Sequence, residues 1–97
     1  MTRIWGMVFL REKRIRDIVV TLTEADLDAA LEEICRPLDV PHPVVLKKHR
    51  GEFERFFRTA FRPEDFMESV HFTRLELEVL REDKKKDAAR AASYEDD

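Results

Sequence analysis

The stretch RIWGMVFLREKRIRDIVVTL, Arg3 to Leu22, decides the fold of this chain. It contains two runs rich in β-branched and aromatic residues, which are the residue types that favour strands. The polar segment REKR between the runs, residues 11–14, suits a turn of a few residues. Because so short a connection allows only antiparallel pairing, the pattern predicts a β-hairpin.

Both faces of this hairpin carry apolar side chains near its centre. In the first strand they alternate, with Trp5, Met7 and Phe9 on one face and Ile4, Val8 and Leu10 on the other. One face is expected to pack on helices, and the second needs another cover, such as a second subunit. Since an exposed apolar patch of more than a few hundred Å² usually marks an interface, we expect a homo-oligomer that self-associates through the apolar hairpin.

Two helices are predicted after the hairpin. Residues 23–38, TEADLDAALEEICRPL, begin with Thr23 as a capping residue and acidic residues in the first turn, and their apolar residues keep a helical period. Two prolines then fix an extended connection, and residues 45–62 return to helical spacing. On a helical wheel the apolar side of this second segment carries Leu46, His49, Phe53, Phe56, Phe57, Ala60 and Phe61.

The end of the chain predicts one more strand and a tail. Pro63 breaks the second helix and favours a short helix over residues 63–70, after which residues 72–81 alternate between apolar and charged side chains. We therefore expect an α+β fold over residues 1–82: a small ββααβ single domain with an antiparallel three-stranded sheet and two main helices packed on one face. Residues 83–97 hold no apolar residue larger than alanine except Tyr94, and are predicted to be a disordered or frayed tail.

The stretch LKKHRGEFERFFRTAF, residues 46–61, mixes phenylalanines with cations and raises the question of nucleic-acid binding. Single-stranded nucleic acids need exposed aromatic rings beside the cations, whereas a helix would place the two sets on opposite sides. The prediction is that Phe53, Phe56 and Phe57 belong to the core. The cations then form a solvated face that is a candidate binding surface for an acidic protein or a nucleic acid: Lys47, Lys48, Arg55, Arg58 and Arg62.

No set of residues predicts a chemical centre. Cys35, His42 and His49 are spaced seven residues apart, which matches no compact zinc motif. No nucleophile, base and orienting residue form a recognisable group, and two glycines in the whole chain do not favour a phosphate-binding loop. We therefore expect no catalytic residue, no metal and no cofactor, and a protein that is not an enzyme.

Composition sets the remaining limits. The 97 residues are 43% hydrophobic and 40% charged with a formal net charge of -3, which suits one small domain. The single cysteine and the absence of a typical leader favour a cytoplasmic location, and the apolar runs are shorter than the roughly 20 residues that span a bilayer. The leading hypothesis is a small non-enzymatic interaction module. The alternative is a nucleic-acid or polyanion binder that uses the basic helix face within residues 44–62.

Overall fold

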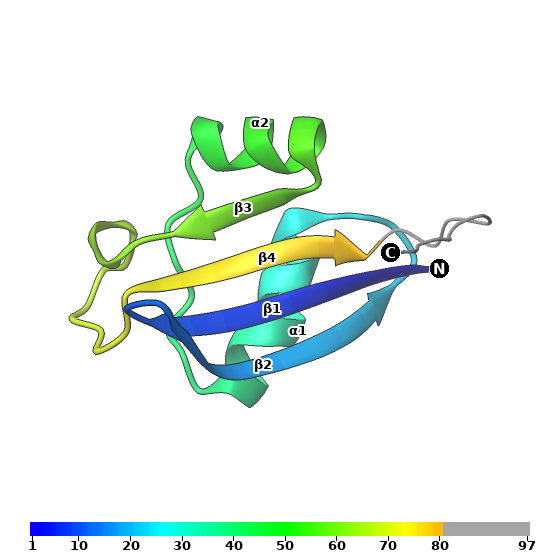
Figure 1. Cartoon of the computed structure of the whole chain (residues 1–97). Coiled ribbons are helices and arrows are strands. Elements are labelled where there is room, and N and C mark those ends of the chain that lie inside the picture. The colour runs from blue at the N-terminus through cyan, green and yellow to red at the C-terminus, as the bar shows by residue number, and fades with distance from the viewer. Residues whose placement is uncertain (81–97) are drawn as a thin grey trace, which may run out of the picture.

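A computed structural model of the chain describes residues 1–80, so the predicted tail at 83–97 lies outside the described residues. These residues form a four-stranded sheet with the order β2-β1-β4-β3, in which every neighbouring pair is antiparallel (Figure 1). The elements in chain order are β1 (Thr2–Leu10), β2 (Lys13–Leu22), α1 (Leu27–Leu38), α2 (Lys47–Phe56), β3 (Arg58–Phe61), the 3-10 turn η1 (Pro63–Asp65) and β4 (Arg74–Leu80).

The predicted hairpin is confirmed as β1 and β2. Its turn is closed by the pair Leu10 and Lys13, and Arg11 adopts a left-handed conformation with φ 60, as tight hairpin turns require. The register shifts beside Val8 and Phe9, so that Ile15 is left without a partner on β1. This irregularity is a β-bulge in the first half of β2.

The core lies between one face of the sheet and the helices. Ile4 and Val8 of β1 and Leu75 and Leu77 of β4 are fully buried on this face. Helix α1 crosses behind the sheet over β1 and β2, and α2 lies beside β3 at the other end (Figure 1). The core side of α1 is formed by Leu27, Ala30, Leu31, Ile34, Cys35 and Leu38.

The first predicted helix is confirmed, with a later start. Asp26 rather than the predicted Thr23 is the N-cap, because Asp26 is extended and its side chain accepts a hydrogen bond from the Asp28 N–H at 3.1 Å. Pro37 lies in the last turn, and the helix ends directly after it, with Asp39 as the C-cap in the left-handed conformation.

The predicted helix over residues 45–62 is wrong in its second half, and the sheet therefore has four strands instead of three. Helix α2 ends at Phe56, because Phe57 adopts φ 62 and reverses the chain. Residues 58–61 then pair with β4 as strand β3. Similarly, the predicted short helix at 63–70 is only the turn η1, and the last strand is confirmed as β4 over residues 74–80.

This reversal changes the position of the phenylalanines. Phe53 is buried as predicted, with 5% of its surface exposed. The predictions for Phe56 and Phe57 are wrong, since 63% of Phe56 and 37% of Phe57 is exposed. A residue at the end of a helix and one in a chain reversal no longer share the helical face that the wheel assigned to them.

Candidate interaction surfaces

The sheet face opposite the helices is partly covered by the chain's own charged side chains. The Trp5 indole Nε1–H donates to Asp17 Oδ2 at 2.8 Å, and the Arg14 guanidinium lies 4.8 Å from the centre of the indole ring. The Arg74 guanidinium lies 3.9 Å from the centre of the Phe9 ring. These cation–π contacts place charge above the aromatic residues of β1, which were expected to need a second cover.

Two of the exposed apolar side chains of the hairpin belong to the edge strand β2. Ile15 is 38% exposed and Val19 is 44% exposed. Strand β2 ends the sheet on this side, so its outer edge pairs with no strand among residues 1–80. The apolar surface and the unpaired backbone edge therefore coincide on one strand.

The direction of the backbone groups along this edge follows from one hydrogen bond. The Phe9 carbonyl accepts from the Thr73 N–H at 2.7 Å, so the odd-numbered residues of β1 direct their backbone groups toward β4. The even-numbered residues of β1 therefore face β2, where they pair with even-numbered residues 16–22. Asp17, Val19 and Thr21 consequently direct their N–H and C=O groups outward from β2.

The two halves of β2 differ in the features that normally prevent edge pairing. The first half contains charged residues and the bulge at Ile15, both of which discourage a further strand. The second half, residues 18–22 with the sequence IVVTL, has no charge, proline or glycine. Figure 1 shows α1 passing behind β2 nearer to the start of the strand, so that the later half of the outer edge is not crossed by this helix.

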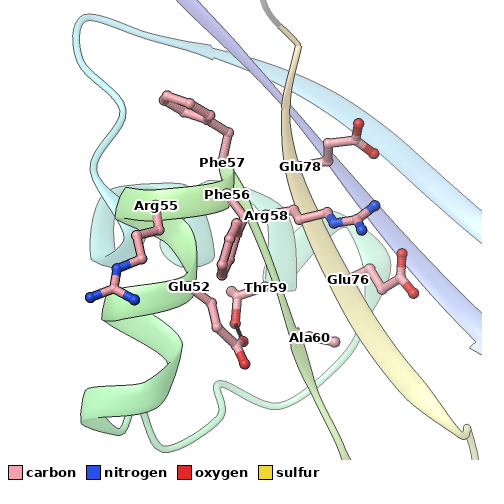
Figure 2. Close-up of a pocket in the computed structure, with 9 residues that line it drawn as sticks. All are labelled: Glu52, Arg55, Phe56, Phe57, Arg58, Thr59, Ala60, Glu76 and Glu78. Atoms are coloured by element: carbon pink, nitrogen blue, oxygen red, sulfur yellow. Dashed lines mark hydrogen bonds between the residues drawn. The ribbon is translucent and has the colours of Figure 1, made fainter.

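At the opposite edge of the sheet, a groove of about 820 Å³ lies between α2 and the outer part of the sheet (Figure 2). We call it the β3 groove. Strand β3 is its central element, and its outer edge pairs with no strand in the part of the chain that the structure describes. The lining residues come from α2, β3, β4 and the reversal between α2 and β3: Glu52, Arg55, Phe56, Phe57, Arg58, Thr59, Ala60, Glu76 and Glu78.

Backbone orientation in β3 is fixed in the same way as in β2. The Phe57 carbonyl accepts from the Val79 N–H at 2.8 Å, so Phe57 and the alternate residues after it direct their backbone groups toward β4. The intervening residues Arg58 and Ala60 therefore direct their N–H and C=O groups away from β4. The β3 groove thus contains an unpaired strand edge next to an exposed phenylalanine.

The charged residues of the β3 groove differ in their partners. Glu52 Oε1 accepts from the Thr59 hydroxyl at 2.7 Å, and Glu76 Oε2 lies 2.6 Å from Arg74 Nε. Within residues 1–80, the side chains of Arg55 and Arg58 form neither a hydrogen bond nor an ion pair. Figure 2 shows the Arg58 side chain reaching over β4 between Glu76 and Glu78, whereas the Arg55 side chain points away from β3.

The cations predicted to share one helix face do not all lie together. Lys47 and Lys48 begin α2, and Arg55 is in its last turn. Arg58 begins β3, and Arg62 follows that strand. The structure therefore brings Arg55 and Arg58 into the β3 groove and separates them from the other three, because the helix ends before Arg58. The acidic and strand residues of the groove were missed, since only the pairing of β3 with β4 brings them close.

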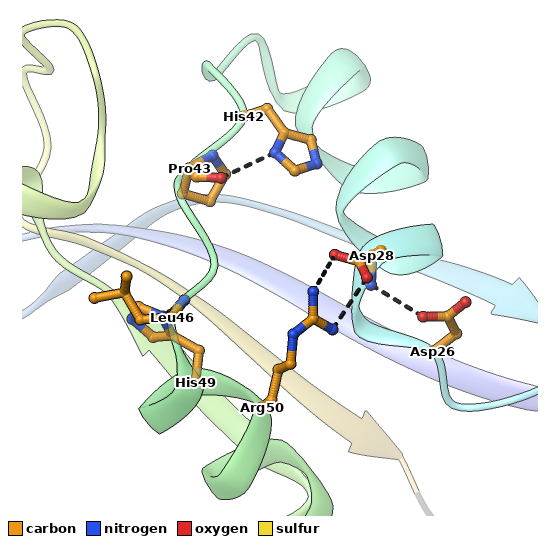
Figure 3. Close-up of polar contacts among 7 residues, drawn as sticks. All are labelled: Asp26, Asp28, His42, Pro43, Leu46, His49 and Arg50. Carbon is orange, nitrogen blue, oxygen red and sulfur yellow. Dashed lines mark hydrogen bonds and ion pairs between the residues drawn. The ribbon is translucent and has the colours of Figure 1, made fainter.

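Cys35, His42 and His49, which are evenly spaced in the sequence, have separate surroundings in the structure. His49 is fully buried, its Nδ1 accepts from the Leu46 N–H at 2.9 Å, and its Nε2 lies 3.3 Å from Asp65 Oδ2. His42 contacts the neighbouring Pro43 carbonyl at 3.0 Å (Figure 3). Burial raises the pKa of the Cys35 thiol to about 11. Among residues 1–80 no group of three or more potential metal ligands is found.

His49 and Arg50 fix the start of α2, one by a local hydrogen bond and the other by an ion pair to α1. The bond from Leu46 to His49 closes the first turn of α2, in the way that a polar residue at this position closes a capping box. The next residue, Arg50, forms an ion pair with Asp28 at 3.0 Å and so joins α2 to the start of α1 (Figure 3). Both contacts serve to position the helix that borders the β3 groove.

Comparison with known proteins gives no family assignment. No protein-family model matches the chain, no curated protein matches it, and no solved structure matches it. Among the helices in residues 1–80, none is long and apolar enough to cross a membrane.

Proposed function

We propose that this protein is a small non-enzymatic interaction module that self-associates through the outer edge of β2. The observation that supports this proposal is the charge-free second half of β2, residues 18–22, on an edge that carries exposed Val19. An edge strand of this kind is a template for pairing with another chain. A second copy of β2 is a suitable partner, because a two-fold axis between the strands makes their pairing antiparallel.

One register uses every outward backbone group between Asp17 and Thr21. If Val19 lies opposite Val19 of the second copy, Asp17 lies opposite the other Thr21, and all three outward residues of both strands can exchange hydrogen bonds. The Thr21 hydroxyl can then donate to the carboxylate of Asp17. On the core side of the sheet, Ile18 lies opposite Val20 of the second copy, so apolar residues meet apolar residues.

The charges beyond the paired segment are also complementary. Lys13, Arg14 and Arg16 lie at the start of β2, whereas Glu24 and Asp26 follow its end. Antiparallel pairing brings the basic start of each strand near the acidic continuation of the other. Such rim charges contribute more to orientation and to the association rate than to affinity.

The alternative of a polyanion-binding helix face receives less support. Lys47 and Lys48 are at the opposite end of α2 from Arg55, and the groove that holds Arg55 and Arg58 also contains three glutamates. Phosphate binding usually depends on several cations along one surface without intervening acids.

The mass of the protein in solution tests the proposal. Sedimentation equilibrium would compare the parent with Val19→Lys and with Val44→Lys, a matched variant in the connection before α2, where Val44 is 40% exposed. The parent and Val44→Lys should approach twice the chain mass of 11.5 kDa, whereas Val19→Lys should remain a monomer, because two lysines would face each other on the axis. A parent that stays monomeric at about 1 mM would contradict self-association, since that concentration detects even weak dimers.

A further inference from the structure

We propose that the β3 groove binds an extended segment of a partner protein through an arginine side chain, which lies over the Phe56 ring and forms an ion pair with Glu52. This surface lies at the opposite edge of the sheet from β2. A dimer formed through β2 would leave the β3 groove accessible, so either proposal can fail without the other.

Glu52 and Phe56 form one side of the groove. They are four residues apart on α2, a spacing that brings two side chains onto one face of a helix with about 5–6 Å between their Cβ atoms. Figure 2 shows both side chains on the side of α2 that faces β3, whereas Arg55 points away. The part of α2 that borders the groove therefore presents a carboxylate beside an aromatic ring.

The carboxylate of Glu52 is held in place but keeps its negative charge. Its Oε1 accepts from the Thr59 hydroxyl at 2.7 Å, and Thr59 is only 5% exposed, so a buried hydroxyl of β3 fixes the glutamate side chain. A neutral hydroxyl does not compensate the charge. Within residues 1–80, Glu52 forms no ion pair and its Oε2 has no hydrogen bond.

The other charges of the groove do not offset this carboxylate. Arg58 and Glu78 are paired residues of β3 and β4, and Figure 2 shows Arg58 reaching toward β4. Glu76 Oε2 lies 2.6 Å from Arg74 Nε. Since Arg55 points away from β3, the side of the groove next to α2 is left acidic, which favours a cation.

The protein's own sheet shows how an arginine uses a ring and a carboxylate together. On the sheet face opposite the helices, the Arg74 guanidinium lies 3.9 Å from the centre of the Phe9 ring and also contacts Glu76. A guanidinium can do both because it is planar, stacks on the ring and directs its N–H groups to the carboxylate. Phe56 is 63% exposed, and no guanidinium of residues 1–80 lies over its ring. Glu52 and Phe56 thus offer a partner's arginine the contacts that Arg74 makes within the chain.

The edge of β3 is the reason that the arginine should belong to an extended segment. Arg58 and Ala60 direct their N–H and C=O groups away from β4, and main-chain hydrogen bonds to such an edge hold an extended peptide of any sequence. Because β3 has only four residues, this edge provides few hydrogen bonds. Selection of the partner then depends on its side chains, and first on the arginine.

A matched set of peptides tests the arginine directly. The probe is a capped nine-residue peptide in which valine and threonine alternate around a central arginine, since these residues favour an extended chain. In one control, citrulline replaces the arginine, which keeps the shape of the side chain and removes its charge. In the other control, glutamate replaces it. Each peptide would be titrated into the ¹⁵N-labelled full chain, with the amide signals of Arg58 and Ala60 as reporters.

The arginine peptide should shift the amides of Arg58 and Ala60 and slow their hydrogen exchange. The citrulline peptide should bind about tenfold more weakly, because it loses both the ion pair and the attraction of a cation to the ring. The glutamate peptide should bind more weakly still, since its carboxylate would meet the carboxylate of Glu52.

Variants of α2 identify the residues that recognise the arginine. Glu52→Gln keeps a hydrogen-bond acceptor and should weaken the arginine peptide about fivefold, with little effect on the citrulline peptide. Glu54→Gln makes the same charge change at an exposed position outside the groove lining and should leave both affinities nearly unchanged. Phe56→Ala should also weaken the arginine peptide, because the ring is lost. Thermal melts would verify that all three variants fold.

Several results would overturn the proposal. Equal binding of the arginine and citrulline peptides, or equal effects of Glu52→Gln and Glu54→Gln, would show that Glu52 does not select a cation. No shift at about 1 mM peptide, or shifts confined to the β2 edge, would show that the β3 groove is not the docking site. Slow exchange of Arg58 and Ala60 in the dilute chain without peptide would show that the chain itself covers this edge, which also contradicts binding of a partner there.

Discussion

Gly6 of β1 lies directly beneath Ile34 of α1: a Cβ atom at position 6 would be 2.5 Å from Ile34 Cγ2. No real Cβ contact is this short, so the absence of a side chain at Gly6 sets how closely α1 approaches the sheet. We predict that Gly6→Ala destabilises the protein by about 1–3 kcal/mol, as overpacking of a core usually does. Chemical denaturation of the parent and the variant would measure this change.

The second glycine provides the matched control. Gly51 lies in α2, and a Cβ at this position would meet nothing within 4 Å. Gly51→Ala should therefore stabilise the protein by about 0.5–1 kcal/mol, because alanine has the higher helix propensity and loses less backbone entropy on folding. Equal and small effects of both substitutions would show that α1 does not pack closely over Gly6.

Phe53 and Phe56 are three residues apart, but their truncation should have very different effects on stability. Phe53→Ala should destabilise by about 3–5 kcal/mol, since Phe53 is buried in the core. Phe56→Ala should change the free energy of unfolding by only about 0.5 kcal/mol, because most of the ring is exposed to solvent. Thermal melts of the two variants distinguish a core position from a surface position, and similar losses for both would contradict the chain reversal at Phe57.

The sequence predicted the elements whose pattern is repeated over many residues. The hairpin, the first helix and the last strand each show a regular period along most of their length, and each was found close to its predicted position. The same alternation and helical periods also predict that the apolar sides of these elements pack together on one face of the sheet. The second half of the predicted long helix failed because β3 has four residues, too few to establish alternation against a continuing helical period.

The reversal that separates α2 from β3 has no local sequence signal. Phe57 adopts the left-handed conformation that glycine or asparagine usually provides, and it is held there by long-range pairing of the strand that follows. The β3 groove could not be predicted for the same reason. In the sequence, Glu76 and Glu78 have the spacing of an ordinary solvated strand face. Only the pairing of β3 with β4 shows that they lie beside Arg58.

Cys35 gives a prediction for the dependence of stability on pH. Burial raises the pKa of its thiol from 9.0 to about 11, so the folded state keeps the proton that the unfolded state loses as pH rises. The free energy of unfolding should therefore fall between pH 9 and pH 11, by up to about 1.4 kcal/mol per pH unit from this thiol. Well below pH 9 the thiol is protonated in both states and contributes no slope.

The variant Cys35→Ala isolates this effect from other groups that titrate at high pH. The smaller side chain should lower the free energy of unfolding at every pH. The dependence of this free energy on pH between pH 9 and pH 11 should nevertheless be shallower than in the parent. Denaturant titrations at several pH values would measure both slopes. Parallel slopes would indicate that the thiol is not shielded from water.

Hydrogen exchange at Val19 tests the central claim, self-association through β2, most directly. The Val19 N–H points outward from β2, whereas the N–H of the neighbouring Ile18 points toward β1 and serves as an internal control. If two copies pair through this edge, exchange of Val19 should slow strongly as protein concentration rises from micromolar to millimolar, while Ile18 stays protected throughout. Rapid exchange of Val19 at every concentration, with Ile18 protected, would contradict pairing through this edge.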